Sequence, residues 1–488
     1  MIALPDSTPL EARERHTLAC LVDASGLLIA EGAARAQAVR LVLTPGELSG
    51  AAAEALLRAQ APVQLLCRDG ELHLPRTVLT LAADILTRRH DGASAPRDIH
   101  GRPVSTANTL VRAEVERWPV LSLLARGIHD ATVAAAGARP CFTIAPWPDG
   151  KRWAAALSHD LDVASLWPAF TGLRLVELAA KGDIRRLLSV LGGAAGRLLS
   201  DPIREGVDTV LDAEVTVGAR STWFIICGTP TFASFLNGDV TYSPESRRVK
   251  KILARLIAEG HEVGLHGSLE TVRDGGRFEA QRGRLEALTG RPARGVRQHF
   301  LRRAVGVTER AMGDAGFAYD STCGFADRNG FRSGLADVFP VWDESTGGAL
   351  SIEEAPFCWM DRALSKYQGI EAPDRWIDDA LELAGRSETV GGLWCGIWHP
   401  NLIPALGFPG APAAYARLVR ELSSRGAWLA PLDAVVRWRV ARRSLRAMDV
   451  SPEGVPTMVG APEVLRFAGA SFRVCDRQGT LRATVATP

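Results

Sequence analysis

Residues 252–268, ILARLIAEGHEVGLHGS, contain one full repeat of the pattern that determines the fold. The apolar spacing predicts a helix over Arg247–Glu259, and the Glu-Gly pair at its end predicts a turn. The run Glu262–His266 predicts a short strand, and Gly267 and Ser268 predict the start of a loop. This stretch therefore combines a helix, a turn and a strand that ends in a histidine.

Strands and helices of this kind alternate on both sides of that repeat. Further strands are predicted at Trp153–Leu157, Ser221–Cys227, Arg294–Arg297, Ala318–Ser321, Leu350–Ala355 and Gly392–Trp398. Helices are predicted between them, including Arg277–Leu288, Ala304–Ala315 and Arg375–Gly385. Repeated β and α segments over about 250 residues indicate parallel strands covered by helices, in either an open doubly wound sheet or a barrel.

The chain is predicted to have three parts. Residues 1–145 are expected to form an α/β accessory domain, residues 146–440 the alternating region, and residues 441–488 a short C-terminal extension. The accessory domain is expected to contain strands at Leu18–Val22, Val39–Leu43 and Val63–Cys67 and helices at Ala51–Ala61 and Pro119–Arg126. A linker is expected at Pro140–Lys151, a helical insert around 165–215, and a hairpin at Ser471–Val485.

The composition is that of a globular protein of 488 residues, with 47% apolar residues, 23% charged residues and a formal net charge of +2. This composition excludes a chain that is mostly disordered or mostly coiled coil. The small net charge predicts no broad affinity for nucleic acid or anionic membrane. No apolar run is long enough for a transmembrane segment. The first residues lack a signal-peptide pattern, so we expect a cytoplasmic protein. The eight isolated cysteines predict mostly buried thiols, which leaves catalysis to histidines and carboxylates.

Two carboxylates follow the first strand of the alternating region, in Leu157-Ser-His-Asp160-Leu-Asp162. Side chains alternate along a strand, so Asp160 and Asp162 share one face. Two carboxylates at one strand end can supply a metal ligand and a general base. A solvated strand end has the same pattern, so this motif alone does not select between the two interpretations.

Four further side chains could join these carboxylates. His266 ends its strand, and Glu270 comes four residues later, close to His266 if the loop forms a helical turn. Arg297, in Gly295-Val-Arg297-Gln-His299, can hold a carboxylate base in its charged form. His399 follows Trp398 at another strand end, and an apolar wall suits a general acid. Taken singly, each histidine could equally be a hydrogen-bonded core residue, and Arg297 could equally be a surface arginine.

The order of these motifs resembles that of the NodB-type polysaccharide deacetylases, a carbohydrate esterase family. The resemblance covers about residues 150 to 405 and rests on Asp160 and Asp162, then Gly260–His266, Arg297 and His399, in that order. It is closest to a subgroup that carries an N-terminal accessory domain, which the fragment Asp98-Ile-His-Gly101-Arg102 also resembles.

The resemblance implies a distorted (β/α) barrel with its site at the carboxyl ends of the strands. By position, Asp160 would be the general base, Arg297 would orient it, and His399 would protonate the leaving amine. Asp162 and His266 would bind a divalent metal, Zn²⁺ in the first instance. The family's second metal histidine corresponds to Glu270 here, so Glu270 is the expected third ligand.

Two other residues could complete the ligand set, and two are expected to meet the substrate. His299 and Ser268 are the alternatives to Glu270 as the third ligand. His299 and Trp398 are expected to contact the substrate.

The predicted activity is metal-dependent hydrolysis of an N-acyl group, N-acetyl above all, on an amino sugar of a glycan or glycan precursor. The partner is therefore a carbohydrate, and the sequence favours no particular oligomeric state. A cytoplasmic location would suit a precursor such as a lipid- or nucleotide-linked sugar. Two alternatives stay open: a non-catalytic carbohydrate-binding pseudoenzyme in surface-polysaccharide assembly, and an amidohydrolase acting on a non-sugar amide.

Overall fold

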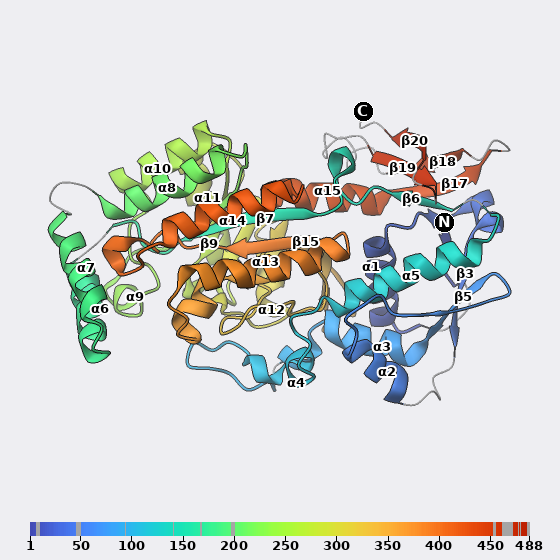
Figure 1. Ribbon diagram of the computed structural model, residues 1–488, viewed down its shortest axis with the longest axis horizontal. Coiled ribbons are helices and arrows are strands. Elements are labelled where there is room, and N and C mark those ends of the chain that lie inside the picture. The colour runs from blue at the N-terminus through green and yellow to red at the C-terminus, as the bar shows by residue number, and fades with distance from the viewer. Residues whose placement is uncertain are drawn as a thin grey trace.

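The computed structural model describes residues 1–488 apart from 6–9, 45–49, 93, 140, 166–167, 197–200, 452–454, 461–471, 477, 479 and 486–488. Among the residues it describes, no helix is both long and apolar enough to cross a bilayer. The ribbon has helical layers around a central sheet, with the N-terminal elements at one end (Figure 1).

A ten-stranded sheet forms the centre of the molecule. Its strand order is β12-β13-β11-β10-β9-β8-β7-β15-β14, and β16 also pairs with β7. The strands are β7 (Ala154–Leu161), β8 (Thr222–Ile226), β9 (Glu262–Gly267), β10 (Gly295–Gln298), β11 (Tyr319–Asp320), β12 (Phe339–Asp343), β13 (Gly348–Glu354), β14 (Trp359–Met360), β15 (Leu393–Ile397) and β16 (Trp428–Leu429). All pairs are parallel except β12 with β13.

This sheet confirms the predicted fold class. It is curled, as in a distorted barrel, and its two ends, β12 and β14, are not paired with each other among the described strands. Each of the seven strands predicted in the alternating region is present with small shifts at its ends. The short strands β12, β14 and β16 were not predicted.

Helices cover the sheet because their apolar residues recur on one face. In α10 (Arg247–Ala258) the buried residues are Val249, Ile252, Leu253 and Leu256, which is the spacing of one helix face. Ser246 caps this helix by accepting a hydrogen bond from the amide of Val249. The other helices around the sheet are α8 (Pro202–Val215), α11 (Gly275–Thr289), α12 (Val307–Asp314), α13 (Pro373–Thr389) and α14 (Ala411–Ser424).

The segment between β7 and β8 is helical. It contains α6 (Pro168–Ala180), α7 (Ile184–Gly196) and then α8. Figure 1 shows α6 and α7 at the end of the molecule toward which the β15 arrow points. These two helices therefore lie beyond the carboxyl ends of the parallel strands.

The N-terminal elements form a second sheet of order β18-β17-β2-β1-β3-β5-β4. Its strands are β1 (Ile2–Ala3), β2 (Ile29–Ala30), β3 (Val39–Thr44), β4 (Leu66–Arg68), β5 (Glu71–Pro75), β17 (Arg446–Val450) and β18 (Pro456–Val459). The helices beside it are α1 (Ala12–Ser25), α2 (Gly50–Leu57), α3 (Arg76–Leu86), α4 (Thr109–Arg112) and α5 (Val120–Ala136). The predicted strand at Leu18–Val22 is wrong, because Leu18, Leu21 and Val22 are buried at helical spacing in α1.

The end of the chain returns to this N-terminal region. After α15 (Leu432–Ser444), β17 pairs in parallel with β2. The hairpin β19 (Phe472–Asp476) and β20 (Leu481–Val485), predicted from the sequence, pairs with β6 (Phe142–Ile144) from the expected linker. The expected division into three parts stays a prediction.

Candidate metal centre and active site

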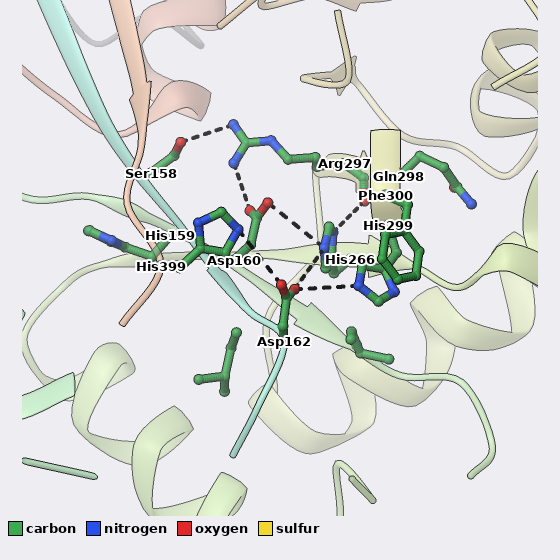
Figure 2. Close-up of polar contacts among 12 residues, drawn as sticks. Ser158, His159, Asp160, Asp162, His266, Arg297, Gln298, His299, Phe300 and His399 are labelled. Carbon is green, nitrogen blue, oxygen red and sulfur yellow. Dashed lines mark hydrogen bonds and ion pairs between the residues drawn. The ribbon is translucent and has the colours of Figure 1, made fainter. Parts of the chain in front are cut away.

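Neighbouring strand ends bring the predicted site residues together. Asp160 lies near the end of β7, and Asp162 follows that strand. His266 lies in β9, and β10 pairs with β9 in the register Arg297 opposite His266. His399 follows β15, the other neighbour of β7. Figure 2 shows these side chains converging on one point.

Asp162, His266 and His299 form a cluster with the geometry of a metal site. One ligand atom from each lies within 4.8 Å of the others. The Oδ1 atom of Asp162 is 3.3 Å from Nε2 of His266 and 3.7 Å from Nε2 of His299. Asp162 Oδ1 is buried and has no hydrogen-bond partner among the described residues. One carboxylate oxygen and two imidazole nitrogens fit a divalent cation that keeps a position open for water.

Each imidazole of the cluster is oriented through its other nitrogen. Nδ1 of His266 is 2.8 Å from the carbonyl oxygen of Arg297, and Nδ1 of His299 is 3.0 Å from Oδ1 of Asp239. These contacts leave both Nε2 atoms facing Asp162, the arrangement that metal-binding histidines commonly show. Burial lowers the pKa of His266, but Asp160 and Asp162 raise it by more, so the net shift is upward.

The turn that carries His299 has an unusual backbone. Phe300 and Leu301 both have positive φ, 55° and 56°. Two successive residues with side chains in this region store strain, which surrounding contacts must maintain. The ring of Phe300 stacks on His299 at 4.2 Å and on His100 at 5.0 Å. The turn is thus held between the Asp162–His266–His299 cluster and a loop of the N-terminal region.

Asp160 and Arg297 form a buried ion pair beside the cluster. Nη1 of Arg297 donates to Oδ1 of Asp160 at 2.7 Å, and Nη2 donates to the hydroxyls of Ser158 and Ser321 at 2.9 Å each. The other carboxylate oxygen, Oδ2, lies 3.8 Å from Nε2 of His266. Burial raises the pKa of Asp160, but Arg297 and the nearby imidazoles lower it further, so the carboxylate form is favoured.

His399 is held by a carboxylate that the sequence reasoning did not assign to the site. Nδ1 of His399 lies 2.6 Å from Oδ1 of Asp361, and its backbone amide donates to Oδ2 at 2.6 Å. The Nε2 atom lies 3.7 Å from Oδ2 of Asp162. Burial lowers the pKa of His399, but Asp361 and the carboxylates of the cluster raise it by more. The imidazole therefore holds a proton more tightly than an ordinary histidine.

His159 confirms the alternation along β7. Its ring turns away from the cluster and contacts the carbonyl oxygen of Trp398 at 2.9 Å and Oε1 of Glu214 at 2.8 Å. It is fully buried in this hydrogen-bonded position. His159, which directly precedes Asp160, is thus hydrogen-bonded on the opposite face of β7.

The structure corrects the expectation for Glu270. His266 lies in extended strand β9, and the short turn Leu269–Thr271 begins only after it, so the two residues do not share a helix face. The Glu270 carboxylate is 59% exposed and pairs with Arg277. Ser268 also lies outside the cluster, with its hydroxyl accepting from Gln281 at 2.7 Å. His299 occupies the place expected for the third ligand.

Trp398 is a second correction. It is buried in the main hydrophobic core, where its ring stacks on Trp359 and makes tilted contacts with Trp376 and Tyr415. The strand alternation that points His399 toward the cluster points its neighbour into the core. Trp398 therefore packs in the core beneath the site and does not line the cavity.

A cavity of about 110 Å³ opens onto the cluster. It is lined by Asp160, Asp162, His266, His299 and His399, and also by residues that the sequence reasoning missed, including Arg102, Arg362, Lys366 and Tyr367. Arg102 comes from the N-terminal region and donates to the hydroxyl of Tyr367 at 3.0 Å. The family-like fragment Asp98–Arg102 was the only sequence signal for this contact.

Comparisons with known proteins give similarity in structure only. No family model and no curated protein matches the chain. A protein from Mycobacterium smegmatis, provisionally assigned as a polysaccharide deacetylase, is 20% identical, with a TM-score of 0.42 over 61% of this chain and 93% of that one. PuuE allantoinase is 15% identical, with a TM-score of 0.42 over 62% of this chain and 95% of that one.

A CE4-family pseudoenzyme from Bacillus anthracis is also similar, at 9% identity and a TM-score of 0.32 over 59% of this chain and 66% of that one. Because the identities and TM-scores are low, none of these similarities is evidence for the reaction that this protein catalyses. Any assignment of a reaction must rest on the side chains of the site. Polysaccharide deacetylases and CE4-family proteins, the group that the motif order resembles, are thus among the solved structures similar to this chain.

Proposed function

We propose that the protein is a metal-dependent hydrolase that removes an N-acyl group, N-acetyl in the first instance, from an amino sugar of a glycan or glycan precursor. The observation that carries the proposal is the buried, unpartnered Oδ1 of Asp162, which faces two oriented imidazoles among the described residues. A base held by Arg297 and an acid held by Asp361 flank this centre.

A divalent cation bound by Asp162, His266 and His299, for which Zn²⁺ is our candidate, would polarise the acyl carbonyl and acidify water. Asp160 accepts the proton of the attacking water. Arg297 keeps its carboxylate ionised and fixes Oδ1, which leaves Oδ2 on the side of the cluster. The base is thus preoriented before substrate arrives.

His399 completes the reaction as the acid. Asp361 holds its Nδ1, so the Nε2 atom faces the cavity. The raised pKa favours the protonated form of this ring. Donation of that proton to the amide nitrogen lets the C–N bond break and the amine leave. The cytoplasmic location expected from the sequence remains part of this proposal.

The test is acetate release by the zinc-loaded protein from a panel of N-acetylated sugars and non-sugar amides, with metal content measured in parallel. Asp160→Asn should lower kcat by about 10²- to 10⁴-fold, as expected for loss of a general base, and should retain the metal. Asp274→Asn, which alters an exposed helix cap, is the matched control.

Three outcomes would contradict the proposal. A protein that binds no divalent metal would exclude it. A metal-loaded protein that binds chitooligosaccharides but releases no acetate would favour the non-catalytic carbohydrate-binding alternative. Turnover of non-sugar amides alone would favour the general amidohydrolase.

A further inference from the structure

A second cavity adjoins the metal cluster. It has a volume of about 340 Å³ and lies between the helices α6 and α7 and the strand-end loops. Arg362 and Lys366 line both this cavity and the one over the metal cluster. Arg362 and Lys366 thus lie at the boundary that the two cavities share, beside a molecule whose acyl group is at the cluster.

The second cavity is cationic. Its lining includes five basic side chains, Arg174, Lys181, Arg186, Arg362 and Lys366, and two acidic ones, Glu177 and Glu371. Glu177 pairs with Arg174 at 2.6 Å and with Lys181 at 2.9 Å, and Glu371 pairs with Arg186 at 2.6 Å. Both acidic side chains thus form ion pairs with the three cations of the α6–α7 segment.

Arg362 and Lys366 differ from these three cations. Within the part of the chain that the structure describes, neither has a carboxylate at ion-pair distance. The Arg362 guanidinium carbon lies 5.9 Å from the ring centre of Phe408, and the Lys366 nitrogen lies 5.4 Å from that of Tyr367. Arg362 is half-buried and Lys366 is exposed, so both can bind an anionic ligand by charge-assisted hydrogen bonds.

Two polar atoms of the same wall also lack partners. Ser365 Oγ and Asn401 Oδ1 are buried, and neither has a hydrogen-bond partner among the described residues. Both residues line the second cavity. Buried polar groups in native proteins are nearly always hydrogen-bonded, and a polar ligand in this cavity would give these two atoms partners.

The segment that provides this wall is tied to the catalytic acid. Asp361, which holds His399, directly precedes Arg362, and the π-helical turn Ala363–Tyr367 follows. Such turns occur frequently at functional sites. The same turn therefore fixes the distance between the acid and the two unpaired cations.

We propose that the second cavity is a subsite for a phosphate group attached to the acylated amino sugar, with Arg362 and Lys366 as its recognition residues. Guanidinium and ammonium groups bind phosphate oxygens by charge-assisted hydrogen bonds. Asn401 Oδ1 accepts from a hydroxyl of the same molecule, and Ser365 Oγ donates to it. The inference rests on the proposed function and narrows its substrates to sugar phosphate esters.

The first test measures binding in the zinc-loaded Asp160→Asn protein, in which turnover is suppressed. N-acetylglucosamine 1-phosphate should bind at least about tenfold more tightly than methyl N-acetylglucosaminide, the gain expected of charged hydrogen bonds. Adding Arg362→Gln or Lys366→Gln should remove most of that preference, measured in each variant as the ratio of the affinities for the two sugars. Arg375→Gln and Lys251→Gln, at exposed positions on α13 and α10, are the matched controls. Equal affinities for the two sugars, or a preference that survives both cavity variants, would overturn the subsite.

The second test separates the subsite from the reaction. Acetate release from the methyl glycoside reports the reaction alone. Among phosphate esters, a nucleotide-linked and a short-prenyl-linked N-acetylglucosamine distinguish the two sources of the phosphate. With wild-type Asp160, Arg362→Gln should raise KM for both esters by a larger factor than KM for the methyl glycoside. Hydrolysis without a phosphate preference refutes the subsite only. A phosphate preference that depends on Arg362 without any hydrolysis refutes the reaction only.

Discussion

His299 connects three parts of the site through one ring. Its Nε2 atom faces Asp162, its Nδ1 atom faces Asp239, and Phe300 stacks on its plane. Asp239 also accepts a hydrogen bond from the backbone amide of Leu269, which lies in the turn that carries Glu270. The position proposed for the third ligand is therefore built from loops and held by a buried carboxylate.

His299→Ala should lose most of the bound metal, because it removes one of three donor atoms. Glu270→Ala should retain the metal, because its carboxylate is exposed and paired with Arg277. Metal content after dialysis against a weak chelator distinguishes the two variants. Loss of metal from Glu270→Ala with retention in His299→Ala would restore the ligand set expected from the sequence.

Asp361→Asn should move the alkaline limb of the pH–rate profile to lower pH. In the proposed reaction His399 must carry a proton, and Asp361 raises the pKa at which it loses that proton. Removing the carboxylate charge lowers this pKa, by about one unit or more for a partner in direct contact. The profile of the metal-loaded variant measures the shift, with the exposed Asp374→Asn as control. An unmoved limb would show that another group is the acid.

The residue patterns predicted Asp160, Asp162, His266, Arg297 and His399 because each lies at or next to the end of a strand whose alternation the sequence displays. Glu270 could not be placed in the same way, because the prediction required a helical turn directly after His266. The loop residue Asp239 had no periodic neighbour that could indicate its direction. Asp361 follows the two-residue strand β14, and nothing in the sequence linked it to His399.

At the scale of elements, β10 positions the base through its register. Its pairing with β9 and β11 sets Arg297 beside His266 and places Gly295 against the ring of Tyr319. A Cβ on Gly295 would lie 2.1 Å from Cζ of that ring, which is fully buried. The absence of a side chain at this position therefore allows the two strands to approach.

Gly295→Ala should destabilise the protein by about 1–3 kcal/mol or more, as overpacking of a dense core does. Gly283→Ala is the control, because it lies exposed in α11 with open space around its Cβ, and alanine stabilises a helix interior by about 1 kcal/mol over glycine. Chemical unfolding curves compare both with the wild type. Equal effects of the two substitutions would show that β10 can shift without cost.

The alternating elements were predictable because apolar runs of strand length, separated by helical periods, leave little choice of structure. The strand prediction at Leu18–Val22 failed because a short apolar run fits a buried helix equally well. The strands β14 and β16 have only two residues each, too few for a pattern. The return of β17 to the first sheet is a long-range pairing, which local sequence cannot indicate.

For the whole molecule, buried charges join the N-terminal region to the central sheet. Arg88 pairs with Glu309 at 2.9 Å, and Asp91 pairs with Arg332 at 2.6 Å, with all four side chains at most 5% exposed. Breaking one partner of such a pair leaves a buried charge uncompensated. Together with Arg102 at the active-site cavity, these contacts make the N-terminal region part of the structure that holds the site.

His90 lies at this junction and makes the stability of the molecule sensitive to acid. Asn108 Nδ2 contacts its Nε2 at 2.6 Å, while its Nδ1 is buried without a partner among the described residues. Burial lowers the pKa of His90 to about 4; Asp91 opposes the shift, and Arg332, Arg88 and Arg303 add to it. In an unfolded chain the pKa of a histidine is about 6.5.

Below pH 6.5 the unfolded chain therefore binds a proton that the folded protein does not, so the free energy of unfolding falls as the pH drops and levels off below about 4. At about 1.36 kcal/mol per pKa unit, the loss reaches roughly 3 kcal/mol. His90→Gln keeps an acceptor for Asn108 and does not titrate, so its free energy of unfolding should fall less between pH 7 and pH 4.5. Urea unfolding at both values measures the difference, with exposed Gln60→Ala as a control that should follow the wild type. If the His90→Gln and wild-type proteins lose equal stability, the acid sensitivity originates elsewhere, and His16, whose pKa burial also lowers to about 4, is the next residue to substitute.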